Sequence, residues 1–196
     1  MKICHVINSL NRGGAESHLL ELVKAQSNTR LNVDVVVIGK DNLNILSIEK
    51  ELNNSCNNIY RLKGPRMFNL FSYFKLKNII KNNQYDIIHS HQPRSDYMIF
   101  LLKKYIFPKT FFKWVVSIHG KYDSYLENNY KKIFKLYFFK KLVKSWIYAD
   151  SVIVISNEVE NWLKNLTTQI HPFVINYWIS LKEQESTNID INPTIG

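Results

Sequence analysis

Histidines stand at two points of this sequence where apolar runs end. His89 and His91 end the run that begins at Tyr85, and His119 ends the run that begins at Trp114. If these runs are parallel strands, their carboxyl ends meet at the edge of an open sheet where ligands bind. Imidazoles there could exchange protons, form hydrogen bonds or bind a metal. Each histidine alone could be an ordinary polar strand-end residue, but together they favour a site. Further candidates at the same edge are Gly120, Ser156 and Asn157.

Two glycines near the start of the chain offer a second chemical feature. Gly13 and Gly14 lie between the apolar run Ile3–Ile7 and a segment whose apolar residues recur at helical spacing, Leu19 to Val23. A strand, a glycine turn and a helix N-terminus can together bind an anion, because the first amides of the helix have no partner within it. The alternative is a tight turn without a ligand. The dinucleotide motif G-x-G-x-x-G and the triphosphate motif G-x-x-x-x-G-K-[ST] are both absent.

The sequence does not favour a metal centre or an enzyme nucleophile. His89, His91 and His119 could bind zinc, but the sequence shows no evident fourth ligand and no D-x-D pair for a divalent cation on a diphosphate. The nucleophile motif G-x-S-x-G is also absent. We therefore expect a site that needs no metal and no resident cofactor.

Apolar strand-like runs alternate with amphipathic segments along most of the chain. This alternation predicts right-handed β-α-β units and one doubly wound, mostly parallel sheet of about seven strands, a Rossmann-like α/β domain over residues 1–181. Residues 182–196 are polar and irregular, and we expect a linker there. The predicted strands are 3–7, 32–39, 59–62, 85–91, 114–119, 151–156 and 173–175. The predicted helices begin near residues 14, 44, 69, 93, 124 and 157, the third capped by Asn69 and the last by Asn157.

Composition and charge narrow the class of protein. The 196 residues are 45% apolar, which suits one globular domain, and the net charge is +10. Eleven lysines lie between Lys103 and Lys144 against only Asp123 and Glu127, so this stretch suits an anionic partner, or else reflects a lysine-rich coding bias. Arginines are few and no nucleic-acid motif is present, so we expect no nucleic acid. Two cysteines are too few for a disulfide framework and suit a reducing compartment. The sequence shows no signal peptide and no membrane-spanning run, so we expect a cytoplasmic protein.

One lysine-rich segment, Tyr130–Tyr148, has the period of an amphipathic helix. Its apolar residues Phe138, Phe139, Leu142, Val143, Trp146 and Ile147 share one arc, and Lys140, Lys141 and Lys144 lie opposite. The structural interpretation is a helix that covers the sheet and shows a basic face to water. The functional interpretation is peripheral docking on an anionic membrane, such as the inner face of the cell membrane.

Four segments in order resemble the N-terminal domain of family 4 glycosyltransferases, which have the two-domain GT-B fold. They are Gly13–Glu16 (GGAE), Asp86–His91 (DIIHSH), Val115–Gly120 (VVSIHG) and Ala149–Ser156 (ADSVIVIS). The resemblance covers essentially the whole chain. It implies retaining, metal-independent transfer of a sugar from a nucleotide-diphosphate-sugar donor to a glycan or lipid-linked acceptor, as in polysaccharide biosynthesis.

The resemblance also implies roles for single residues. Gly13 and Gly14 match the loop that faces the donor diphosphate, and His119 matches the histidine that hydrogen-bonds the transferred sugar. The positions that match the acceptor cleft are Arg12, His91, Gln92, Arg94 and Ser95.

The chain departs from the family pattern in two ways. Family members carry a second Rossmann-like domain with an E-x7-E motif and most of the nucleotide-sugar site, which we expect in cis or in trans of this chain. The usual N-G-[IV]-D segment is replaced by Asn176–Ser180. We therefore expect the acceptor-side half of an enzyme, inactive alone. The alternative is a non-catalytic acceptor-binding or partner subunit of a split glycosyltransferase.

Overall fold

The computed structural model describes residues 1–42, 44–62, 70–107, 111–122 and 132–176, with side chains from 136 onward in the last range. The predicted cap Asn69 and the predicted linker 182–196 lie outside the described residues.

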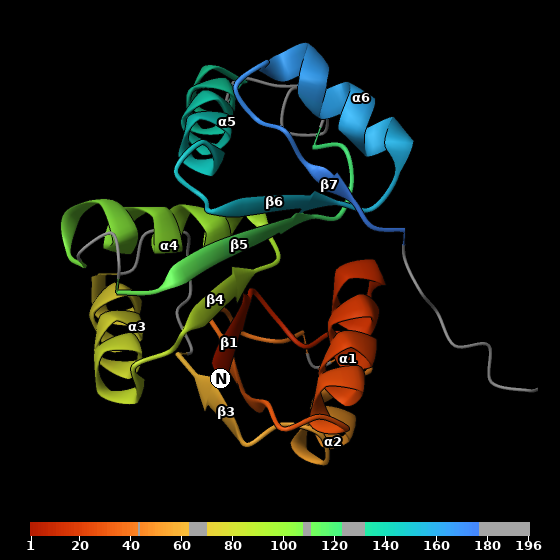
Figure 1. The fold of residues 1–196 in the computed structure, drawn as a ribbon, viewed down its shortest axis with the longest axis vertical. Coiled ribbons are helices and arrows are strands. Elements are labelled where there is room, and N and C mark those ends of the chain that lie inside the picture. Colours follow the sequence, from red (N-terminus) through yellow and green to blue (C-terminus); the bar gives the residue numbers. More distant parts are fainter. Residues whose placement is uncertain (43, 63–69, 108–110, 123–131, 177–196) are drawn as a thin grey trace, which may run out of the picture.

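Seven parallel strands form one sheet, which confirms the predicted fold class (Figure 1). Their order across the sheet is β3-β2-β1-β4-β5-β6-β7. The first strand of the chain, β1, is therefore near the centre, with later strands added on both sides of it. The strands are β1 (Lys2–Ile7), β2 (Asn32–Val37), β3 (Asn58–Arg61), β4 (Ile87–Ser90), β5 (Lys113–Ile118), β6 (Ser151–Val154) and β7 (Phe173–Val174).

Helices cover the two faces of the sheet unequally. On one side, α1 (Gly14–Ser27) and α2 (Glu49–Asn53) pack over β1 and β2 (Figure 1). The apolar residues of the remaining helices belong to a larger core on the other side. These helices are α3 (Leu70–Asn83), α4 (Pro93–Tyr105), α5 (Lys132–Trp146) and α6 (Asn157–Leu166).

The β-branched run in β2 explains its central place. Val35 and Val37 lie in the core beneath α1, whereas Val36 and Ile38 lie in the core on the opposite side. All four are buried, as expected for a parallel strand that is covered on both faces.

Several details differ from the sequence predictions. The second helix begins at Glu49, after a short antiparallel bridge between Asn11 and Ser47. The N-cap of α6 is Ser156 rather than Asn157, because the Ser156 backbone is extended and its Oγ accepts a hydrogen bond from the Val159 amide at 3.3 Å. Among the described residues, no helix is long and apolar enough to span a membrane.

The amphipathic character of α5 is confirmed, with one correction. Five of the six predicted apolar residues are buried, but Ile147 is 40% exposed because it follows the last turn of the helix. Lys140, Lys141 and Lys144 are exposed, as predicted.

Candidate active site

The helix α1 brings Gly14 and His119 to the same end of the sheet. Gly14, His18 and Leu22 are spaced four residues apart and so follow one face of the helix. The His18 ring meets the His119 ring edge-on, with 5.5 Å between centroids. Gly14 therefore lies one helical turn, about 5.4 Å of axial rise, from a residue that contacts His119.

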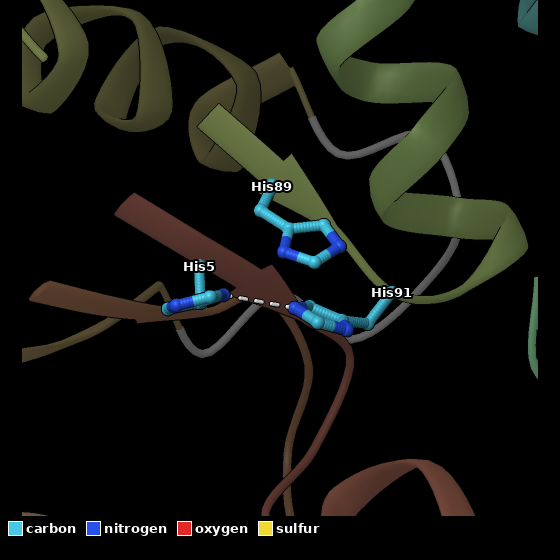
Figure 2. A group of neighbouring side chains, drawn as sticks. All are labelled: His5, His89 and His91. Carbon is cyan, nitrogen blue, oxygen red and sulfur yellow. Dashed lines mark hydrogen bonds between the residues drawn. The ribbon is translucent and has the colours of Figure 1, made fainter. Parts of the chain in front are cut away.

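A chain of hydrogen bonds runs from the far end of α1 to His119. Gln26 Oε1 accepts from His5 Nε2 at 2.8 Å, and His5 Nδ1 lies 3.0 Å from His91 Nε2. Figure 2 shows this second bond, from β1 to the residue just past β4. His91 Nδ1 lies 3.2 Å from His119 Nε2, which completes the chain. Four side chains, none of them neighbours in sequence, are thus connected in one line: Gln26, His5, His91 and His119.

His89 supports the chain from the side. Its ring contacts that of His91, with centroids 4.1 Å apart and the planes tilted by 35°. Figure 2 shows the two rings next to each other. Its Nε2 lies 2.7 Å from Ser117 Oγ, so His89 is bonded to β5 and not to the other imidazoles. This contact restricts the orientations that are open to His91.

The pleat of the strands explains why these rings meet. His5 pairs in register with His89, and His89 pairs with Val115. Alternate residues of a strand point to the same face, so His91 and His119, two residues beyond His89 and Ser117, continue on the face that α1 covers. The histidine cluster is thus a direct consequence of register.

Burial keeps these imidazoles uncharged near neutral pH. It lowers the pKa of His5 to about 4 and that of His119 to about 3. Burial, followed by repulsion from neighbouring histidines, holds the pKa of His89 and His91 well below 6.5. Each of these four rings therefore carries one N–H and one lone pair, so it can donate once and accept once.

The two glycines at the N-terminus of α1 have different surroundings. A Cβ at Gly13 would lie 2.7 Å from Glu16 Oε2, because the Glu16 carboxylate folds back toward the start of the helix. The Glu16 side chain is held there by Gln92 Nε2, which donates to Oε1 at 2.8 Å. A Cβ at Gly14 would have no atom of the described residues within 4 Å, apart from its chain neighbours and the backbone of its own helix. The space in front of Gly14 is open, while the space at Gly13 is occupied by the protein itself.

Gln92 fixes the loop between β1 and α1. Besides Glu16, its side chain accepts a hydrogen bond from the Asn8 amide at 2.9 Å. Asn8 O in turn accepts from the Gly39 amide at 2.7 Å, and a Cβ at Gly39 would come within 2.7 Å of that oxygen. The strand ends of β1, β2 and β4 are therefore tied together around the glycine turn.

The residues predicted for an acceptor cleft are not all at the surface. His91 and Ser95 have 0% exposure, and the Ser95 hydroxyl accepts from the Gln92 amide at 3.1 Å. His91 thus backs His119 and Ser95 supports the turn, so neither offers its side chain to a ligand in this structure. Arg94 is partly exposed beside Gly39, and burial lowers its pKa.

The other candidates lie around the same edge or turn away from it. Arg12 is exposed, but its Nη2 forms an ion pair with Glu51 at 2.6 Å and so points toward α2. Gly120 is partly exposed directly after His119, and Asn157 is exposed at the start of α6. The Ser156 hydroxyl is engaged in capping that helix.

Two groups of three histidines have the spacing to hold a metal ion. The ring nitrogens of His5, His89 and His91 lie within 4.8 Å of one another, as do those of His18, His91 and His119. Neither group is the set considered from the sequence. A metal at either group would compete with the hydrogen bonds of His91 to His5 or to His119, because each ring nitrogen has one lone pair or one proton.

Sequence reasoning missed His5, His18 and Gln26. His5 stands between Ile3 and Ile7 inside a buried strand, and that polar interruption was the available signal. His18 and Gln26 lie four and twelve residues after Gly14, and only the structure shows that both side chains reach the histidines of the sheet.

Comparison with known proteins identifies the chain by family. The model of Glycosyltransferase Family 4 matches residues 12–176. No curated protein sequence matches the chain.

Solved structures with the same fold include the lipopolysaccharide outer core galactosyltransferase WaaB, with a TM-score of 0.67 at 15% identity over 93% of this chain. Anabaena Alr3699/HepE, crystallised with UDP and glucose, has a TM-score of 0.65 at 16% identity over 91% of this chain. Sucrose-phosphate synthase from Thermosynechococcus elongatus has a TM-score of 0.58 at 16% identity over 88%. The chain spans 47%, 45% and 47% of these three chains, respectively, and so matches one half of each.

Proposed function

Because the chain belongs to glycosyltransferase family 4, we propose that it is the acceptor-side half of an enzyme that transfers a sugar from a nucleotide-diphosphate-sugar to a glycan or lipid-linked acceptor. In this proposal the N-terminus of α1 faces the donor diphosphate and His119 faces the transferred sugar. Transfer proceeds with retention and without a metal. The second half of the enzyme, in cis or in trans, supplies most of the nucleotide site.

The observation that carries this proposal is the open space in front of Gly14. Glycine is a weaker helix former than alanine. No atom of the described residues lies where a Cβ would be, so packing does not require glycine here. A ligand that must reach the helix amides closely does require it, and a diphosphate is such a ligand.

The arrangement supports departure of a diphosphate. As the bond between sugar and phosphate breaks, negative charge grows on the phosphate and positive charge on the sugar ring. The amides at the start of α1 are fixed in place and stabilise the negative charge on the phosphate without having to reorganise. Neutral His119 can accept a hydrogen bond from a sugar hydroxyl without adding positive charge beside the cationic sugar. The protein therefore does not need a nucleophile for this step.

Two variants test the proposal in a protein that carries both halves. We expect Gly14→Ala to keep the fold but to lower sugar transfer at least about tenfold, a free-energy loss of about 1.4 kcal/mol, because the methyl group occupies the phosphate position. We expect His119→Ala to abolish transfer. His171→Ala is the control, since His171 is an exposed histidine in the segment between α6 and β7. Full transfer by folded Gly14→Ala and His119→Ala proteins would refute the assignment.

The alternative is a non-catalytic partner subunit that supplies only an acceptor cleft. Affinity capture that returns a separate Rossmann-like chain with E-x7-E would favour a split enzyme. In that complex, full transfer by the folded His119→Ala variant would favour a non-catalytic role for this chain, whereas loss of transfer would favour a catalytic one.

A basic surface on α5 also favours peripheral membrane binding, where lipid-linked acceptors reside. Exposed Tyr137 and Ile147 lie beside exposed lysines, and a groove of about 590 Å³ runs between α5 and the segment after α6. Its lining includes Leu136, Lys140, Lys141, Lys144 and Leu166. Apolar side chains within a lysine-rich surface suit the boundary between anionic headgroups and acyl chains.

Vesicle flotation tests the membrane proposal. We expect binding to vesicles that contain anionic lipid, weakening as salt rises, and lost when Lys140, Lys141 and Lys144 are replaced by glutamine. The matched control replaces the exposed lysines Lys40, Lys50 and Lys81, which lie on other elements. Equal binding to neutral vesicles, or equal loss in both triple variants, would contradict docking through α5.

A further inference from the structure

The hydrogen-bonded line from Gln26 to His119 has a direction that is set at its far end. We propose that Gln26 is a positioning residue that acts through His5 and His91 to fix the proton of His119 on Nε2, which leaves Nδ1 as a hydrogen-bond acceptor. Gln26 lies on the last turns of α1, away from the glycine turn, and does not touch His119 itself.

The first step is the contact between Gln26 and His5. Gln26 Oε1 is a carbonyl oxygen and can only accept, so His5 must donate through Nε2 across the 2.8 Å contact. His5 is buried and neutral, with a pKa of about 4. A neutral imidazole has one N–H proton, so His5 Nδ1 is unprotonated and must accept.

The two remaining hydrogen bonds are fixed in the same way. Bare His5 Nδ1 lies 3.0 Å from His91 Nε2, so His91 donates from Nε2. His91 is also buried and neutral, which leaves its Nδ1 bare and facing His119 Nε2 at 3.2 Å. His119 therefore donates from Nε2, and its own Nδ1 carries the lone pair. Contact with His89 keeps the His91 ring in the orientation that both bonds need.

The order of protons along the line is not arbitrary. If the end group at position 26 donated instead of accepting, every bond would reverse and His119 would carry its proton on Nδ1. His119 would then present a donor where it now presents an acceptor. Whether residue 26 on α1 donates or accepts thus decides whether His119 offers an acceptor or a donor. At metal sites, the hydrogen bond to one ring nitrogen sets the tautomer of a histidine in the same way.

This inference deepens the proposed function, and its consequence for substrate choice rests on that function. An acceptor at His119 Nδ1 selects a sugar with a free hydroxyl at the contacted position. Under the proposed function, a deoxy or O-methyl sugar at that position offers no hydroxyl proton to His119 and would be discriminated against.

Histidine tautomers can be measured directly in the protein without substrate. Protonated and bare ring nitrogens differ widely in ¹⁵N chemical shift, and the chain has six histidines, so each can be assigned by single replacement. We expect His5, His91 and His119 in the wild-type protein all to show the Nε2–H form at neutral pH. The Nδ1–H form at His119 would overturn the proposal.

Replacement of Gln26 tests the coupling. Gln26→Glu keeps an acceptor and should leave the His119 tautomer unchanged. Gln26→Lys offers only donors and should shift His119 toward the Nδ1–H form. Ala25→Lys adds the same charge one residue away on an exposed position and should change nothing. A folded Gln26→Lys protein that retains the wild-type His119 spectrum would overturn the proposal.

If Gln26→Lys does not fold, Gln26→Met decides the question, since methionine fits similar space and neither donates nor accepts strongly. We then expect both tautomers of His119 to be populated, and an unchanged single tautomer would refute the coupling. These spectra do not depend on sugar transfer, so the proposed function can fail while the tautomer result stands, and the reverse.

Discussion

Replacing His5 by asparagine should remove a defined part of the acid sensitivity of this protein. His5 has no exposed surface, and its pKa is lowered from 6.5 to about 4 because burial penalises the charged ring. A base whose pKa is depressed in the folded state binds fewer protons folded than unfolded. Its contribution to stability is therefore present above pH 6.5 and is lost as pH falls toward 4. Linkage between these two values gives a loss of about 2 kcal/mol between about pH 7.5 and about pH 5.

Comparing the pH dependence of stability in the wild-type protein and in His5→Asn measures the contribution of His5. The contribution of His119 to stability is also lost as pH falls, since its pKa is lowered to about 3. The contribution of buried Asp96 is lost as pH rises, since its pKa is raised to about 7. The total pH dependence of the wild-type protein thus mixes several groups. In the His5→Asn variant the contributions of His119 and Asp96 remain. The His5 contribution is missing, together with the part of the lowered pKa of His89 and His91 that repulsion from His5 causes.

Urea unfolding at the two pH values is the appropriate assay. We expect the wild-type protein to lose about 2 kcal/mol more unfolding free energy than His5→Asn between about pH 7.5 and about pH 5. His171→Asn is the control, because that histidine is exposed and lies outside the line of imidazoles. Equal losses in wild-type and His5→Asn proteins would refute the claim that a buried, neutral His5 anchors the line of imidazoles.

Three further changes follow from packing and capping. Gly39→Ala should cost about 1–3 kcal/mol of unfolding free energy in urea, since its Cβ would lie 2.7 Å from Asn8 O; a neutral effect would contradict that close approach. As pH rises from 4 to 8, the unfolding free energy of Asp96→Asn should rise by up to about 4 kcal/mol relative to that of the wild-type protein. The reason is that the pKa of the buried Asp96 carboxyl is about 7, so the stability that its protonated form contributes is lost over this range. Parallel pH curves for the two proteins would disprove it. Ser156→Ala should lower stability by about 1 kcal/mol through loss of the cap on the Val159 amide, and no change in the urea midpoint would argue against the cap.

Much of the fold follows from local pattern. The four consecutive β-branched residues Val35–Ile38 indicate a strand buried on both faces, and its place beside β1 agrees with the right-handed crossover rule. The glycine turn and the strand-end histidines were also predictable, because parallel strands bring their carboxyl ends to one edge. Helix starts were less certain, and Ser156 rather than Asn157 caps α6 because extended backbone at Ser156 places its hydroxyl on the Val159 amide.

The connected line of side chains could not be predicted in this way. Gln26 and His119 are 93 residues apart, and their link depends on the angle at which α1 crosses the sheet and on the rotamers of His5 and His91. Similarly, the family resemblance implies a place for His91 and Ser95 in a cleft, whereas both side chains are buried. His91 lies among the rings of His5, His89 and His119, and Ser95 bonds the Gln92 backbone at the start of α4. Burial of polar side chains depends on such packing, which sequence spacing does not contain.

We propose above that Gly14 and His119 contact the same nucleotide-diphosphate-sugar molecule. We would titrate the ¹⁵N-labelled chain with nucleotide-diphosphate sugars and follow the Gly14 amide and the His119 ring nitrogens together. We expect both signals to move along one saturation curve, and Gly14→Ala to weaken the response of both. Saturable binding that moves signals elsewhere and leaves Gly14 and His119 unchanged would contradict it.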